Sequence, residues 1–111
     1  MINITVIRKN QNIITIEATG HSGYAPEGSD IVCSAVSTLT QNLILGLQKV
    51  INLNPIYKID QTIPHLSVTL EKELNAEDMA KAQILMQSAY LGLKDLRDSY
   101  SKFIKIKEKQ L

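Results

Sequence analysis

Short alternations of apolar and polar residues open the chain, and they predict strands with one buried face. Apolar side chains occupy every second position in residues 2–6 and again in residues 14–18. The polar residues 9–12 between these two segments are typical of a turn. The first twenty residues therefore predict a β-hairpin that ends at Gly20.

Similar alternations return in the second half of the chain. Residues 56–59 and 66–70 read as two strands joined by the turn-like residues 60–64, which predicts a second hairpin. Ile104 and Ile106 alternate with lysines near the C-terminus and predict a last strand. Because lysines discourage further strand pairing, we expect this strand at an edge of the sheet.

Two longer segments have the three-and-four spacing of apolar residues that is typical of amphipathic helices. The first begins after an N-cap at Ser29 or Asp30 and ends before Pro55, which cannot continue a helix. Its apolar face consists of Cys33, Val36, Leu39, Thr40, Leu43, Leu47, Val50 and Ile51.

The second helix opens at Asn75, which with Asp78 three residues later resembles a capping box. Its apolar face consists of Met79, Ala82, Met86, Ala89, Leu93, Leu96 and Tyr100. Ile84, Leu85 and Leu91 widen this face, so they must be covered by the sheet or by a second subunit.

The order of these elements, ββαββαβ, predicts an α+β fold in which two long helices pack on a mixed or antiparallel sheet. We expect residues 1–111 to form a single domain, because the sequence contains no linker, low-complexity stretch or convincing repeat.

Composition narrows the function classes. Twelve Lys and Arg balance eleven Asp and Glu, so no global field attracts nucleic acid, and the absence of Trp argues against a base-stacking platform. No apolar run approaches the ~20 residues that cross a bilayer, and the N-terminus does not resemble a leader peptide. These features predict a cytoplasmic protein without a membrane segment. The single cysteine excludes an internal disulfide.

The glycine-bearing loop at residues 22–29 joins two residues with chemistry near neutral pH, His21 and Cys33. Cys33 falls in the first turn of the predicted helix, where unpaired N–H groups favour a thiolate and could hold an oxyanion. A histidine brought close could pair with the thiolate and protonate a leaving amine. These residues therefore favour a nucleophilic cysteine, although a free cysteine is also commonly a buried core residue.

The neighbouring polar residues leave alternatives open. Asp30 would oppose an acidic thiol as a bare charge, but would assist it by orienting His21 or by binding the helix N–H groups. Ser37, one turn after Cys33, could support the sulfur or a backbone carbonyl. A surface or strand-end role is expected for His65. A metal site at His21, Asp30 and Cys33 lacks paired ligand spacings, and no cofactor is expected.

These residues also carry a family resemblance. Gly20-His21, Gly23-Tyr24, Gly28 and the run from Asp30 through Cys33 to Ser37 resemble the signature of the ribosomal-processing cysteine protease family, Prp. The resemblance extends to the length and element order of most of the chain.

The resemblance implies a small bacterial cysteine endopeptidase that removes the N-terminal extension of a large-subunit ribosomal protein precursor. It implies Cys33 as nucleophile and His21 as general acid or base, with Asp30, Ser37 and Gly20 in support. It further implies a homodimer and a mobile substrate loop that includes Ser22, Gly23, Tyr24, Gly28 and Ser29.

A rival interpretation is a non-catalytic, ribosome-associated module that binds a protein tail and in which Cys33 only packs. The apolar seam of the second helix independently favours a helix-mediated dimer. The lysine-rich residues 102–109 are expected to form a solvated edge, with at most weak contact to ribosomal RNA.

Overall fold

The computed structural model describes residues 1–26, 30–60 and 64–111. The elements are β1 (Ile2–Lys9), β2 (Asn12–Thr19), α1 (Ile31–Leu45), a π-helical segment (Gly46–Val50), β3 (Ile56–Asp60), β4 (His65–Thr69), α2 (Ala76–Ser99) and β5 (Ile104–Gln110). This order confirms the predicted ββαββαβ arrangement.

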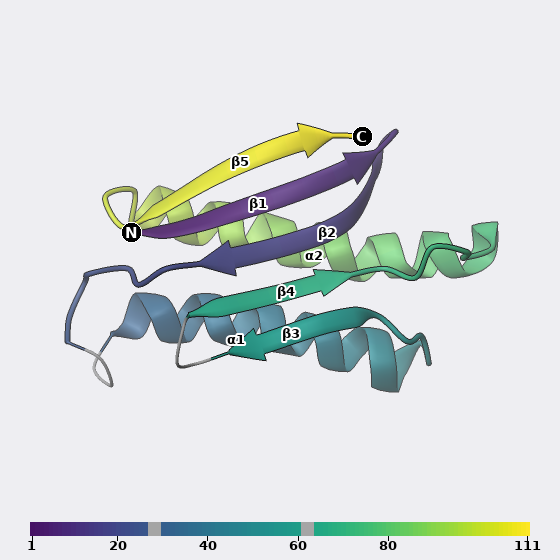
Figure 1. Cartoon of the computed structure of the whole chain (residues 1–111), viewed down its shortest axis with the longest axis horizontal. Coiled ribbons are helices and arrows are strands. Elements are labelled where there is room, and N and C mark those ends of the chain that lie inside the picture. The colour runs from purple at the N-terminus through teal and green to yellow at the C-terminus, as the bar shows by residue number, and fades with distance from the viewer. Residues whose placement is uncertain (27–29, 61–63) are drawn as a thin grey trace.

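The five strands form one mixed sheet in the order β3-β4-β2-β1-β5. Neighbouring strands are antiparallel except for β1 and β5, which run parallel with Ile2 opposite Ile104. The lysine-bearing strand β5 therefore lies at an edge, as predicted (Figure 1).

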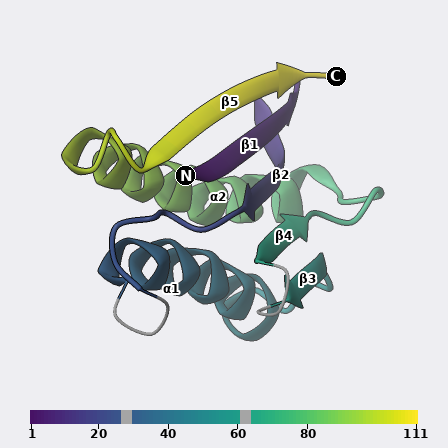
Figure 2. The same cartoon turned by 60° about the vertical axis from the view of Figure 1, so that its left-hand side comes forward.

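Both helices cover the same face of the sheet, α1 beneath β3 and β4 and α2 beneath the other strands (Figures 1 and 2). The alternating strand residues Ile4, Val6 and Ile16 are fully buried beneath them. Each helix adds its own apolar stripe, with Val36 on α1 and Met86 on α2 almost completely buried. The periodic pattern of the sequence thus defines a single core between the two layers.

The α2 N-terminus has the predicted cap. The side-chain oxygen of Asn75 accepts a hydrogen bond of 2.7 Å from the backbone N–H of Asp78. Of the residues that widen the α2 face, Leu85 packs against Gly46 at the end of α1. Ile84 is 71% exposed and Leu91 is 62% exposed. The sheet does not cover these two residues.

One segment departs from the expectation about membranes. Ile31–Val50 consists of α1 and the π-helical segment that continues it. By length and composition alone, this range is long and apolar enough to cross a bilayer. In the fold its apolar stripe packs into the core, with Val32, Leu43 and Leu47 buried. The fold buries 33% of its most apolar window, as for an amphipathic helix that packs one face on the core.

Candidate active site

Gly20 fixes the direction in which the chain leaves the sheet after β2. Its φ is +90°, and a Cβ at this position would lie 2.6 Å from the carbonyl oxygen of Met1. Its N–H also donates to the carbonyl of Pro64 over 3.1 Å. Only glycine fits here without a shift of the backbone. The next residue, His21, is therefore held between the N-terminus and the segment that leads into β4.

Asp30 is the N-cap of α1. One of its carboxylate oxygens, Oδ1, accepts hydrogen bonds from the backbone N–H groups of Val32 and Cys33, each 3.0 Å long. Its own backbone is extended, as is usual for an N-cap. The structure thus selects Asp30 of the two predicted caps, while Ser29 lies outside the described residues.

The buried carboxyl group of Asp30 has a lowered pKa, which favours its charged form. Burial alone would raise its pKa, but hydrogen bonds from Ser22, Cys33 and Val32 outweigh burial and leave the pKa below its usual value. Since the native pKa is lowered, the cap stabilises the fold above the carboxyl's ordinary range and loses this contribution as the pH falls through the native pKa.

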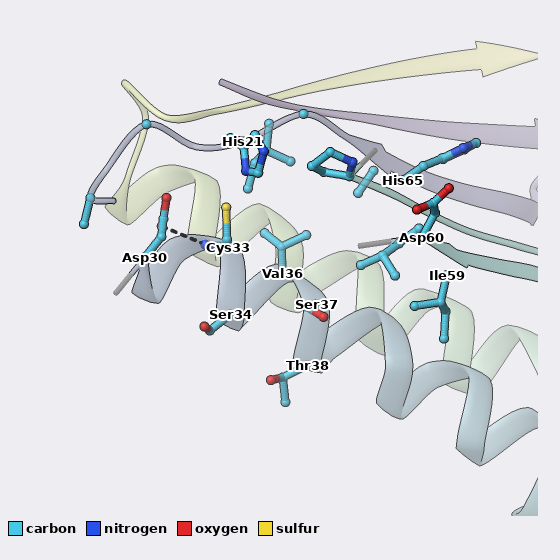
Figure 3. A pocket seen from close by; sticks show the side chains of 17 residues that line it. His21, Asp30, Cys33, Ser34, Val36, Ser37, Thr38, Ile59, Asp60 and His65 are labelled. Atoms are coloured by element: carbon cyan, nitrogen blue, oxygen red, sulfur yellow. Dashed lines mark hydrogen bonds between the residues drawn. The ribbon is translucent and has the colours of Figure 1, made fainter. Parts of the chain in front are cut away.

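Cys33 and His21 line the same pocket, which has a volume of about 660 Å³. Cys33 projects from the first turn of α1, and His21 lies in the segment that follows β2. Figure 3 shows the sulfur pointing away from the helix toward the side of the pocket on which His21 lies. The folded chain therefore brings the two predicted catalytic residues to one solvent-accessible cavity.

Ser22 links the loop to this site through both its backbone and its side chain. Its backbone N–H lies 3.3 Å from Cys33 Sγ, within hydrogen-bond distance. Its hydroxyl donates to Asp30 Oδ2 and accepts from the backbone N–H of Tyr24 over 3.0 Å. Only 3% of Ser22 is exposed. The sequence placed Ser22 with the mobile loop, whereas the structure buries it against the predicted nucleophile.

Tyr24 anchors the next part of the loop on residues near the end of α2 and the start of β5. Its ring makes edge-to-face contacts with Tyr100 at 5.7 Å and with Phe103 at 5.3 Å between centroids. Gly23, between Ser22 and Tyr24, has φ +76° and so provides the left-handed turn between these two attachments. Gly28 and Ser29, the other loop residues in the prediction, lie outside the described residues.

Residues from β3 and β4 form the opposite part of the pocket (Figure 3). His65 lies at the start of β4, as predicted, and its Nε2 is 2.9 Å from Glu17 Oε2 on β2. A surface or strand-end role was expected for His65, and this side chain lines the same pocket as Cys33. The missing information was the strand register, which pairs His65 with Thr19, two residues before His21.

The structure shows partners for two groups whose roles the sequence left open. First-turn N–H groups could hold an oxyanion by the sequence argument, and those of Val32 and Cys33 donate to Asp30. Ser37 lines the pocket, but its hydroxyl accepts a 2.6 Å hydrogen bond from Gln41 Nε2, one turn along α1. Cys33 lies in the pocket, and an oxyanion there would need a donor other than these two N–H groups in this conformation.

Metal ligation at His21, Asp30 and Cys33 is not expected from the sequence, which lacks paired ligand spacings. Within residues 1–26, 30–60 and 64–111, no group of three or more His, Cys, Asp or Glu side chains could hold a metal ion.

A cysteine at a helix N-terminus that shares a pocket with a histidine is the arrangement found in cysteine peptidases. The family model described as Cysteine protease Prp matches residues 1–105, and the chain belongs to this family. It is accordingly a cysteine protease.

Relatives with this description match nearly end to end. The chain is 32% identical over 96 residues to the ribosomal processing cysteine protease Prp of Mycoplasma pneumoniae, covering 86% of this chain and 87% of that protein. It is 23% identical over 107 residues to the Bacillus subtilis protein of the same name, covering 96% of each.

Solved structures agree on the fold. A Streptococcus mutans protein is 31% identical with a TM-score of 0.86, and the match covers 100% of this chain and 96% of that chain. The ribosomal processing protease Prp of Staphylococcus aureus, in complex with a covalently linked product peptide, is 20% identical with a TM-score of 0.85. This second match covers 98% of this chain and 100% of that chain.

Proposed function

We propose that this cysteine protease removes the N-terminal extension of a large-subunit ribosomal protein precursor, with Cys33 as nucleophile and His21 as general acid and base. The observation that carries the residue assignment is the shared pocket of Cys33 and His21. The substrate class is supported by the curated relatives, which are named as ribosomal processing proteases.

In the proposed reaction, the thiolate of Cys33 attacks the scissile carbonyl carbon, and the carbonyl π electrons move to oxygen. As the tetrahedral intermediate collapses, the C–N bond breaks and protonated His21 gives its proton to the leaving amine. Water then attacks the thioester while neutral His21 takes its proton. The acid product leaves, and the thiolate is restored.

The residues that line the pocket support an extended peptide as substrate. Apolar side chains from both layers line it, including Val36 on α1, Ile59 on β3 and Leu66 on β4. His65 and Asp60 add polar groups at the β3–β4 end (Figure 3). A chain whose scissile bond lies at Cys33 would place successive side chains along this mixed wall.

Thiol reactivity tests the assignment of Cys33 as the nucleophile of this protease. For the protease we expect iodoacetamide to alkylate Cys33 rapidly well below about pH 8, since only the thiolate reacts. The measurement is the alkylation rate by intact mass across pH, with a free cysteine in a short peptide as control. A slow reaction that rises only above about pH 8 would contradict the assignment of Cys33 as an activated nucleophile.

We further propose that the protein is a cytoplasmic homodimer. The exposed Ile84 and Leu91 on α2 support an apolar contact between two copies, because the sheet leaves them uncovered. Sedimentation equilibrium measures this directly, and a single monomeric species at micromolar concentration would contradict it.

A further inference from the structure

The hydroxyl of Ser22 has a fixed orientation. It is buried between a carboxylate, Asp30 Oδ2, to which it donates, and the Tyr24 N–H, from which it accepts. A serine hydroxyl has one proton to donate, so the two contacts define where that proton lies. The bond from Tyr24 N–H to Ser22 Oγ closes a short turn through Gly23.

This turn sets the backbone of Ser22 as well as its side chain. The Ser22 N–H thereby lies 3.3 Å from Cys33 Sγ. A donor at this distance interacts more favourably with a thiolate than with a neutral thiol. The hydroxyl also donates to Asp30, the carboxylate that otherwise disfavours a negative sulfur nearby.

From these contacts we propose that Ser22 is a positioning residue, whose hydroxyl holds its own peptide N–H on the sulfur of Cys33 and so stabilises the thiolate. The inference rests on the proposed role of Cys33 as nucleophile. It also ties the state of the sulfur to the loop, because Tyr24, which contributes to the same turn, is packed on Tyr100 and Phe103.

Several other ionisable groups face the pocket, so variants have to be compared at the same pH, at which these groups have the same charge. His21 lies beside the loop and Asp30 at the start of α1, while Asp60 and His65 approach from β3 and β4. His65 is paired with Glu17. Ser22→Ala leaves His21, Asp60 and His65 in place but removes the hydrogen bond to Asp30 that helps to lower the pKa of this carboxyl. The alkylation profile therefore reports both contacts of the hydroxyl, and the amide signal of Ser22 reports the N–H contact with the sulfur by itself.

The test is the pH profile of iodoacetamide alkylation of the full chain, read by intact mass, for wild type, Ser22→Ala and Ser22→Thr. We expect Ser22→Ala to move the midpoint upward by about one pH unit, the equivalent of one ordinary hydrogen bond. At a pH below the wild-type midpoint, its alkylation should slow roughly tenfold. Ser22→Thr keeps the hydroxyl and should restore the wild-type midpoint.

Thr40→Val is the matched control. Thr40 is also buried, and its hydroxyl donates to Val36 O over 2.9 Å on the same helix, but it does not line the pocket. The control should lose stability without moving the midpoint. An unchanged midpoint in Ser22→Ala, or an equal shift in Thr40→Val, would overturn the inference.

Should Ser22→Ala fail to fold, the wild-type protein supplies the answer by NMR. The amide proton of Ser22 should shift with the same midpoint as alkylation, and Cys33→Ala should abolish that titration step. A Ser22 amide that does not respond to ionisation of the sulfur contradicts the inference. Neither readout requires cleavage, so the two proposals can fail separately. If wild-type Cys33 is alkylated only above about pH 8, the result counts against the proposed function. If wild-type Cys33 is alkylated at lower pH but Ser22→Ala has the same profile, the result counts only against this inference.

Discussion

Cys33→Ala is expected to lose at least about 10⁴-fold of the peptidase activity, because no other group in the sequence can form the thioester. The alanine fits the same helical position, and the cap from Asp30 uses backbone N–H groups that the substitution retains. The measurement is kcat/KM on a fluorogenic peptide that spans the extension, with the melting temperature recorded in parallel.

Two controls make this result specific. Cys33→Ser retains a hydroxyl of similar shape but lacks the acidity of a thiol, so it should be nearly as inactive as the alanine variant. Ser101→Ala changes an exposed serine in the segment before β5 and should leave kcat/KM unaltered. Substantial turnover by Cys33→Ala would require a different nucleophile.

His21→Ala should reduce kcat by about 10² to 10⁴-fold, the usual contribution of a general acid and base. His21 is exposed, so its removal should leave the melting temperature close to that of wild type. The pH dependence should also change, because the leaving amine would have to take its proton from water. The measurement is the pH profile of kcat on the same peptide.

His65→Ala offers the comparison on the other histidine. His65 lines the pocket and is held by Glu17, so its loss should alter KM more than kcat. Equal losses of kcat in the two variants would contradict the assignment of acid-base chemistry to His21 alone.

The sequence predicted much of the fold because hydrophobic period and capping act locally. The alternation around Ile4 and Ile16 indicated strands, and the Asn75 cap marked the start of α2. Gly20 and His21 were also identifiable, since a glycine before a chemically active residue at a strand end is a local feature.

The contacts that complete the site could not be predicted in the same way. The role of Ser22 depends on a turn that folds back onto α1, and the place of His65 depends on the register between β2 and β4. The Asp30 cap satisfies the N–H groups of Val32 and Cys33, which was one of the roles that the sequence left open for Asp30. The sequence alone is compatible with several roles for Asp30, and its observed partners are Ser22, Val32 and Cys33.

The most direct test of the central claim is the intact mass of an extended large-subunit ribosomal protein precursor after incubation with the protease. With wild type we predict a single cut that yields the shortened protein and the released extension peptide, and with Cys33→Ala an unchanged precursor mass. A precursor left intact by active wild-type protein, or one cut equally by Cys33→Ala, would contradict the account.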